Sequence, residues 1–79
     1  MYPNPIHGKA SIRFHIDREG IVRLKVYDIM GREIEILVDK VYTPGIYTLE
    51  WEPEGVAGVY FLRLEVGGEV FMERMVLVQ

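Results

Sequence analysis

The fold of this chain is decided in residues 24–37, which read Leu24-Lys25-Val26-Tyr27-Asp28-Ile29-Met30-Gly31-Arg32-Glu33-Ile34-Glu35-Ile36-Leu37. Apolar and charged side chains alternate on both sides of a short turn that contains Gly31. The alternating apolar positions are Val22, Leu24, Val26, Ile34 and Ile36. Because successive side chains of a strand point to opposite faces, this pattern predicts a β-hairpin with one apolar and one polar face. No residue in the hairpin indicates catalysis.

Further segments show the composition and spacing of strands. With the two arms of the hairpin, the predicted strands cover residues 10–16, 21–29, 33–38, 46–52, 59–66 and 69–78. A seventh strand is expected if residues 2–5 or 40–42 pair at an edge. Turn residues recur roughly every ten residues, and no segment combines helical spacing with helix caps. We therefore predict an all-β, Ig-like antiparallel β-sandwich of six to seven strands.

Glycine and proline pairs predict the tightest turns. Gly67-Gly68 separates two apolar runs, as the two central residues of a type I′ hairpin turn do. Pro44-Gly45 suits the centre of a type II turn, within a loop that we predict at residues 39–45. The last strand, 69–78, is apolar on both parities, so we expect it to lie inside a sheet or to change face at a bulge.

Length and composition bound the class of protein. The 79 residues make one domain. We expect a β-sandwich over residues 9–79 and a linker or edge segment at 1–8, where Pro3 and Pro5 cannot sit inside a sheet. The absence of cysteine excludes disulfides and thiolate metal sites. Asn4 and Gln79 are the only side-chain amides, and charged residues are plentiful, a bias found in thermophile proteins that chance in a short, β-rich chain explains equally well.

Charge and hydropathy exclude two classes of partner. The nine basic residues are scattered singly in a chain of net charge −3 and pI about 5.3. Proteins that bind nucleic acid concentrate such residues on one face, so we expect no nucleic-acid binding. No apolar run approaches the ~20 residues that a membrane-spanning helix needs.

Histidine and serine are too few for the common catalytic and metal sites. His7 and His15 are the only histidines, whereas a zinc site needs three or four converging ligands. Ser11 is the only serine, and no glycines flank it in the pattern of a nucleophile elbow. We expect no catalytic, cofactor-binding or metal-binding residues.

The acidic residues favour structural roles. We expect Asp17, Asp28 and Asp39, at predicted strand ends, to cap turns by accepting hydrogen bonds from backbone amides, and not to bind calcium. Glu33 shares a parity with Glu35, as Glu50 does with Glu52, and both pairs alternate with apolar residues. On such a solvated face nothing raises the pKa of a carboxyl group, as the general acid of a glycosidase requires.

Aromatic residues cluster in the second half of the chain. Trp51, Tyr47, Tyr60 and Phe61 are compatible with a platform on which sugars stack. We expect Trp51 to be the anchor of the core instead, because large aromatic side chains supply much of the burial in a small domain.

The order of these motifs resembles that of the type A C-terminal sorting domains of the bacterial type IX secretion system. The matching pieces are Tyr2-Pro3-Asn4-Pro5, Gly8, Ile12-Arg13-Phe14, Leu24-Lys25-Val26-Tyr27-Asp28, Gly31-Arg32, Leu37, Gly45-Ile46-Tyr47, Trp51, Gly58-Val59-Tyr60-Phe61-Leu62-Arg63-Leu64 and Arg74-Met75-Val76-Leu77-Val78. The resemblance covers essentially the whole chain. The Ig-like domain of the flagellar hook-capping protein is similar in its Val-Tyr-Asp, Gly-Arg and Gly-Val-Tyr features.

The resemblance implies a non-catalytic sorting or anchoring domain that directs a cargo protein through the type IX system. Such a domain is exported, passes the periplasm, and reaches the cell surface or the medium. The implied partners are components of the translocon, a sorting peptidase and a cargo domain upstream, with no cofactor. The implied recognition residues are Gly58, Val59, Tyr60, Arg74, Met75, Val76, Leu77 and Val78.

Other functions fit the same pattern. One is a structural Ig-like accessory module of a secreted hydrolase, and another is a hook-capping domain in flagellar assembly. An enzyme is the least favoured reading, since no catalytic constellation is present. An exposed final strand also allows two copies to pair as a homodimer.

Overall fold

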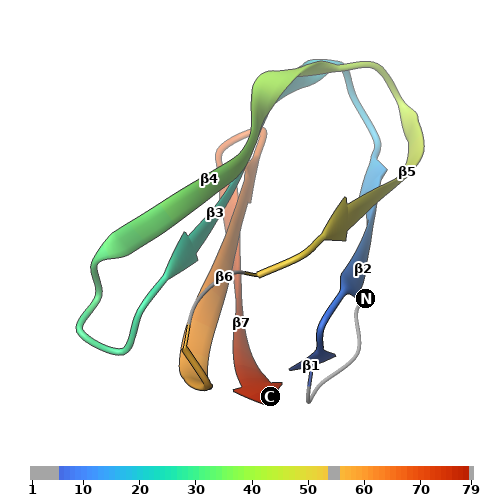
Figure 1. The fold of residues 1–79 in the computed structure, drawn as a ribbon. Coiled ribbons are helices and arrows are strands. Elements are labelled where there is room, and N and C mark those ends of the chain that lie inside the picture. Colours follow the sequence, from blue (N-terminus) through green and yellow to red (C-terminus); the bar gives the residue numbers. More distant parts are fainter. Residues whose placement is uncertain (1–5, 54–55, 79) are drawn as a thin grey trace.

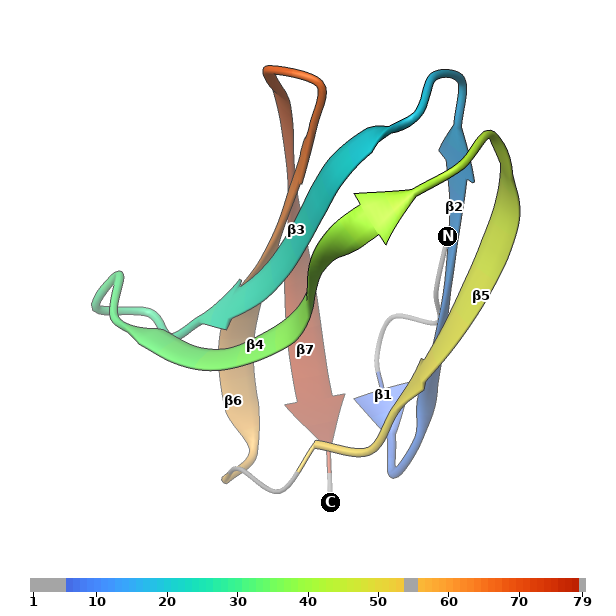
Figure 2. The ribbon, with the colours of Figure 1, turned by 90° about the horizontal axis from the view of Figure 1, so that it is seen from above.

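The computed structural model describes residues 6–53 and 56–78, which form two packed β-sheets and no helix (Figure 1). The strands are β1 (Ile6–His7), β2 (Ala10–Ile16), β3 (Gly20–Tyr27), β4 (Glu33–Tyr42), β5 (Gly45–Trp51), β6 (Gly58–Val66) and β7 (Glu69–Val78). The larger sheet has the order β1-β7-β6-β3-β4, and β2 pairs with β5 in the smaller one. Seen from above, the two sheets stand apart as two layers (Figure 2). The predicted all-β sandwich is confirmed.

The six long strands pair antiparallel, whereas the two-residue β1 runs parallel to the end of β7. Ile6 pairs with Leu77, and His7 with Val78. Part of the predicted edge segment therefore joins the larger sheet. Residues 1–5 of that segment lie outside the described residues, and the boundary of the sandwich at residue 9 stays a prediction.

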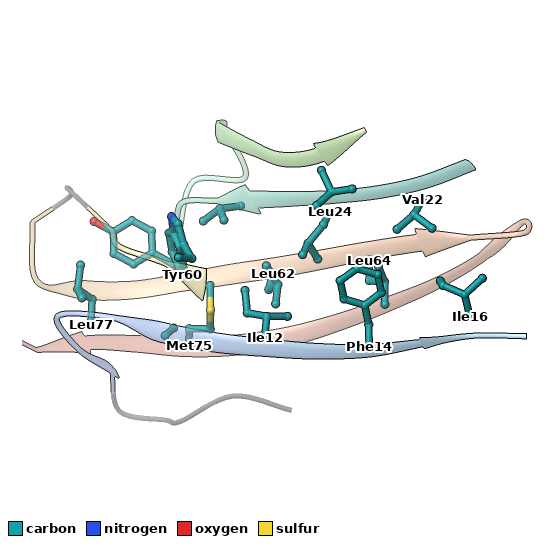
Figure 3. Packing of buried hydrophobic residues seen from close by; sticks show 14 residues of the cluster. Ile12, Phe14, Ile16, Val22, Leu24, Tyr60, Leu62, Leu64, Met75 and Leu77 are labelled. Atoms are coloured by element: carbon teal, nitrogen blue, oxygen red, sulfur yellow. The ribbon is translucent and has the colours of Figure 1, made fainter. Parts of the chain in front are cut away.

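The core lies between the two sheets and follows the predicted alternation. Every second residue of β2 is buried, and these side chains face Val22, Leu24 and Leu62 of the larger sheet (Figure 3). The buried residues are Ala10, Ile12, Phe14, Ile16, Val22, Leu24, Val26, Val38, Trp51, Tyr60, Leu62, Leu64, Met75 and Leu77. Burying one large apolar side chain contributes about 1.5–3 kcal/mol, so this cluster supplies most of the stabilisation.

The corner between β4 and β5 differs from the predicted loop. Strand β4 continues to Tyr42 because Gly20–Leu24 of β3 pair with its second half, so only residues 43 and 44 connect the strands. Tyr42, Phe14 and Tyr47 form an aromatic cluster with ring centroids 4.6–5.7 Å apart. The type II turn was wrong: Gly45 has φ +156°, not the value near +80° that such a turn requires.

Two register shifts in β4 change which of its side chains face the core. Leu24 pairs with Val38 but Lys25 with Ile36, and Val26 pairs with Glu35 but Tyr27 with Glu33. Leu37 and Ile34 are the extra residues of two bulges, which reverse the parity of the strand. The predicted inward placement of Ile34 and Ile36 is therefore wrong, because their side chains are about half exposed.

The β6–β7 hairpin confirms the predicted turn. Gly67 and Gly68 have φ +55° and +84°, the two positive values of a type I′ turn. The pairing of β6 with β7 has no bulge, so the predicted change of face is absent, and among the described residues β7 has a second neighbouring strand only at Leu77 and Val78. In the second half of β7, Met75 and Leu77 are buried and alternate with partly exposed residues, while Val70, Phe71 and Met72 are about half exposed at an edge.

Candidate functional site

The two predicted recognition segments lie side by side in the larger sheet. Gly58, Val59 and Tyr60 begin β6 and pair with Leu77, Val76 and Met75 of β7. This antiparallel register brings together residues that are 15 to 19 positions apart in the sequence. A partner that reads one segment therefore meets the other on the same part of the sheet.

Three of the predicted recognition residues are part of the core. Tyr60, Met75 and Leu77 are buried, and the Tyr60 hydroxyl donates a 2.6 Å hydrogen bond to the carbonyl of Val56. Their side chains hold β6 and β7 against the smaller sheet and are not available to a partner. The alternate residues of both segments, including Val59, belong to the other face. The residues on that face are the ones that a partner can contact. Their role in recognition stays a prediction.

We call this surface the outer face, meaning the side of the larger sheet that is turned away from β2 and β5. Four of its side chains are arranged in two cross-strand pairs: Tyr27 of β3 opposite Phe61 of β6, and Arg63 of β6 opposite Met72 of β7. Together with the β3–β4 turn they form a groove of about 380 Å³. Its lining residues are Tyr27, Asp28, Ile29, Gly31, Phe61, Arg63 and Met72.

The β3–β4 turn, residues 28–32, forms one wall of this outer-face groove. The Asp28 carboxylate accepts hydrogen bonds from the backbone amides of Met30 and Arg32, each 2.9 Å long. It also accepts a 2.7 Å hydrogen bond from Nε of Arg32. Backbone bonds from Gly31 to Asp28 and from Asp28 to Arg32 close the turn, and Gly31 has φ +81°. The predicted capping role of Asp28 is confirmed.

These contacts also act on the titration of Asp28. The backbone amide of Arg32, and then its guanidinium and the amide of Met30, stabilise the carboxylate and lower the pKa of Asp28 below its usual range. Asp28 therefore stays negatively charged and keeps the turn closed at neutral pH.

Ion pairs also lie on the outer face. The Arg23 guanidinium contacts Asp39 at 3.3 Å and Glu65 at 3.7 Å, and Lys25 contacts Glu33 at 3.1 Å. Exposed pairs of this kind contribute about 0–1 kcal/mol each. Asp39 lies within β4 and pairs with Arg23, so its predicted place at a turn was wrong.

The carboxylate pair Glu33 and Glu35 is divided by the bulge at Ile34. Glu33 lies on the outer face beside Lys25, whereas Glu35 is opposite the buried Val26. Glu35 accepts a 3.3 Å hydrogen bond from Nε1 of the buried Trp51. Trp51 is thus a core residue, as predicted, and the expectation that both glutamates share a solvated face was wrong.

The described residues also bear on metals and membranes. Nε2 of His15 lies 3.4 Å from a carboxylate oxygen of Asp17, and no group of three or more potential metal ligands occurs within residues 6–53 and 56–78. In the same part of the chain, no helix has the length and apolar character that crossing a membrane requires.

The sequence did not predict the groove, although one signal was present. Tyr27 and Phe61 are aromatic residues at the positions of β3 and β6 where the alternation otherwise places charged side chains. Their pairing depends on the register between strands that are far apart in the sequence. Only the folded sheet places them next to Met72 and the β3–β4 turn.

Comparison with known proteins gives one match. A family model described as the secretion system C-terminal sorting domain matches residues 1–79, the whole chain. No curated protein matches, and no solved structure matches.

Proposed function

The chain belongs to the family of secretion system C-terminal sorting domains, and on this premise we propose that it is the non-catalytic domain that directs one cargo protein through the type IX system and anchors it at the cell surface. A domain of this family is a type IX sorting signal whose protein is exported to the cell surface or the medium. The observation that carries the proposal is the family match along all 79 residues.

The arrangement of β6 and β7 supports recognition of a folded signal. The predicted recognition residues alternate between the core and the outer face, so a side chain such as Val59 is correctly placed only after Tyr60 and Met75 are buried. We propose that translocon components contact the outer-face residues of these two strands. The other proposed partners are a sorting peptidase, the cargo upstream of this domain and a second copy of the chain.

Strand β7 also supports the proposed homodimer. Described residues of β1 pair with β7 only at Leu77 and Val78, and the edge of β7 carries the half-exposed Val70, Phe71 and Met72. A sheet edge with apolar side chains favours pairing with another strand. Light scattering of the chain at increasing concentration tests for a dimer, which Met72→Lys is expected to weaken.

A secretion assay tests the sorting function. Residues 2–79 are fused behind a Sec signal and a fluorescent reporter in a bacterium with a working type IX system. Val59→Glu changes an outer-face side chain of the recognition segment, whereas Thr48→Glu changes an exposed residue of β5 in the other sheet. We expect surface delivery of the unchanged fusion and of Thr48→Glu, with periplasmic retention of a folded Val59→Glu fusion.

Two results oppose the proposal. Periplasmic retention of the unchanged fusion, with its domain folded, contradicts a sorting function in that host. Equal delivery of Val59→Glu and Thr48→Glu contradicts recognition through the outer face of β6 and β7. Protease resistance of each fusion shows that its domain is folded and separates loss of recognition from loss of structure.

A further inference from the structure

We propose that the outer-face groove docks an acidic segment of a partner protein, which inserts one large apolar side chain and places carboxylates on Arg32 and Arg63. The groove is separate from the recognition segments at residues 58–60 and 74–78. The inference therefore goes beyond the sorting function and stands whether or not the chain is sorted.

The first argument is the exposed apolar surface beside and within the groove. Tyr27 and Phe61 lie side by side in the lining, and Met72 comes from the next strand. Ile29 and Met30 at the turn are 71% and 76% exposed. A concave apolar site with a few polar groups is the usual form of a site that accepts a large apolar group.

The second argument is that the turn is held in place before any partner binds. The Asp28 carboxylate accepts three hydrogen bonds from Met30 and Arg32, and two backbone bonds close the same turn. The turn projects from the end of the β3–β4 hairpin, beyond the sandwich (Figures 1 and 2). Because the wall of the groove is ordered in advance, docking loses little conformational entropy there.

The third argument is charge complementarity. The outer face and its turn carry five basic and four acidic residues, although the whole chain has nine basic and twelve acidic residues. The basic residues are Arg23, Lys25, Arg32, Arg63 and Arg74. The outer face and its turn are thus less acidic than the rest of the chain, which carries four basic and eight acidic residues, and this difference favours an acidic occupant over a basic one.

Arg63 lines the groove, and Arg32 follows Gly31 in the turn beside it; both keep donors for such an occupant. Arg32 contacts Asp28 through Nε and is 76% exposed, and Arg63 contacts Glu65 through Nη1. A guanidinium has five N–H donors, and it binds carboxylates with two parallel hydrogen bonds. Asp28 also lines the groove, but its carboxylate already accepts the hydrogen bonds that close the turn and is therefore not a binding group.

The test is an NMR titration of the ¹⁵N-labelled 79-residue chain with the peptide acetyl-Gly-Glu-Phe-Glu-Gly-amide. We expect the amide signals of Tyr27, Ile29, Gly31, Phe61, Arg63 and Met72 to shift along one binding curve. Peptides with Lys in place of Glu, or Ala in place of Phe, are expected to bind at least about tenfold more weakly. Raising the salt concentration weakens binding of the acidic peptide, because the carboxylate–guanidinium contacts are exposed.

Variants of the chain locate the site. Met72→Glu changes a 55% exposed residue of the groove, and Arg63→Gln removes a charge while keeping most of the side chain. Both are expected to lower affinity at least about tenfold. Ile46→Glu, at a 59% exposed position of β5, is the matched control and is expected to bind like the unchanged chain.

Three results overturn the proposal. One is the absence of shifts in the groove at peptide concentrations on the order of 10 mM. Another is equal binding of the lysine peptide. The third is that the chain binds to phosphatidylcholine vesicles and that Met30→Ser abolishes this binding. Such a result assigns the exposed turn to a lipid surface.

Discussion

Replacing Met75 by alanine is the sharpest test of the core, because Met72 in the same strand provides a matched control. Met75 is 1% exposed and packs between the sheets, whereas Met72 is 55% exposed on the outer face. Truncating a buried methionine to alanine lowers the free energy of unfolding by about 2–5 kcal/mol, because the surrounding side chains do not fully close the cavity. The same change at an exposed position stays within about 0.5 kcal/mol.

These values are large relative to the stability of a chain of this size. Domains have a free energy of unfolding of about 0.05–0.15 kcal/mol per residue, which gives roughly 4–12 kcal/mol here. With an m-value of about 1 kcal/mol/M in urea, a loss of about 3 kcal/mol lowers the midpoint of unfolding by about 3 M. We expect this shift for Met75→Ala and a shift below about 0.5 M for Met72→Ala.

The assay is urea unfolding followed by the fluorescence of Trp51, the single tryptophan, which is buried in the same core. Equal midpoints for the two variants would refute the assignment of Met75 to the core and of Met72 to the outer face. The result also bears on sorting: because Met75 is buried, we expect any loss of surface delivery by a Met75→Ala fusion to follow from its lower stability, which protease resistance of the fusion measures.

Three more changes test the turn and the buried tryptophan. The lowered pKa of Asp28 means that its contribution to stability is present above the usual carboxyl pKa and is lost as the pH falls through the folded value. The urea midpoint of the unchanged chain should therefore exceed that of Asp28→Asn at pH 7, and the difference should shrink below about pH 4; a constant difference would contradict this role. Gly31→Ala places a side chain at φ +81° and should cost about 1–2 kcal/mol in urea unfolding, whereas Gly20→Ala, at a position without positive φ, should cost less. Trp51→Phe removes the hydrogen bond to Glu35 and should lower stability by about 1 kcal/mol in thermal unfolding followed by circular dichroism; an unchanged melting temperature would rule out a net contribution of that bond.

The sequence predicted the core well where strands are regular. In β2 and β3 the period of two is unbroken, so Ile12, Leu24 and their neighbours were placed correctly. In β4 the extra residues Ile34 and Leu37 reverse the parity, and nothing in the local pattern distinguishes such a bulge from ordinary alternation. The error in the placement of Glu35 and Ile36 follows from this.

The candidate site was predicted less completely, for a different physical reason. The groove requires Tyr27 of β3 to lie beside Phe61 and Met72 of the β6–β7 hairpin, and this adjacency is set by the register between β3 and β6, which are far apart in the sequence. Pattern analysis gives the face of each residue but not its neighbours on other strands. The closure of the turn by Asp28 was predictable because its partners, Met30 and Arg32, are local.

The parallel pairing of β1 with β7 has a mechanical consequence for the proposed function, in which a cargo lies upstream of the domain. Among the described residues, tension from the N-terminal side acts first on the two pairs that β1 makes with Leu77 and Val78. The next strand, β2, is held by seven pairs with β5 and by four buried side chains. We therefore expect pulling from the N-terminal side to detach β1 at lower force than β2, with Gly8 and its φ of +79° as the hinge between them. Detachment exposes the second edge of β7 at its C-terminal end, so the load on the cargo and the accessibility of that strand become coupled.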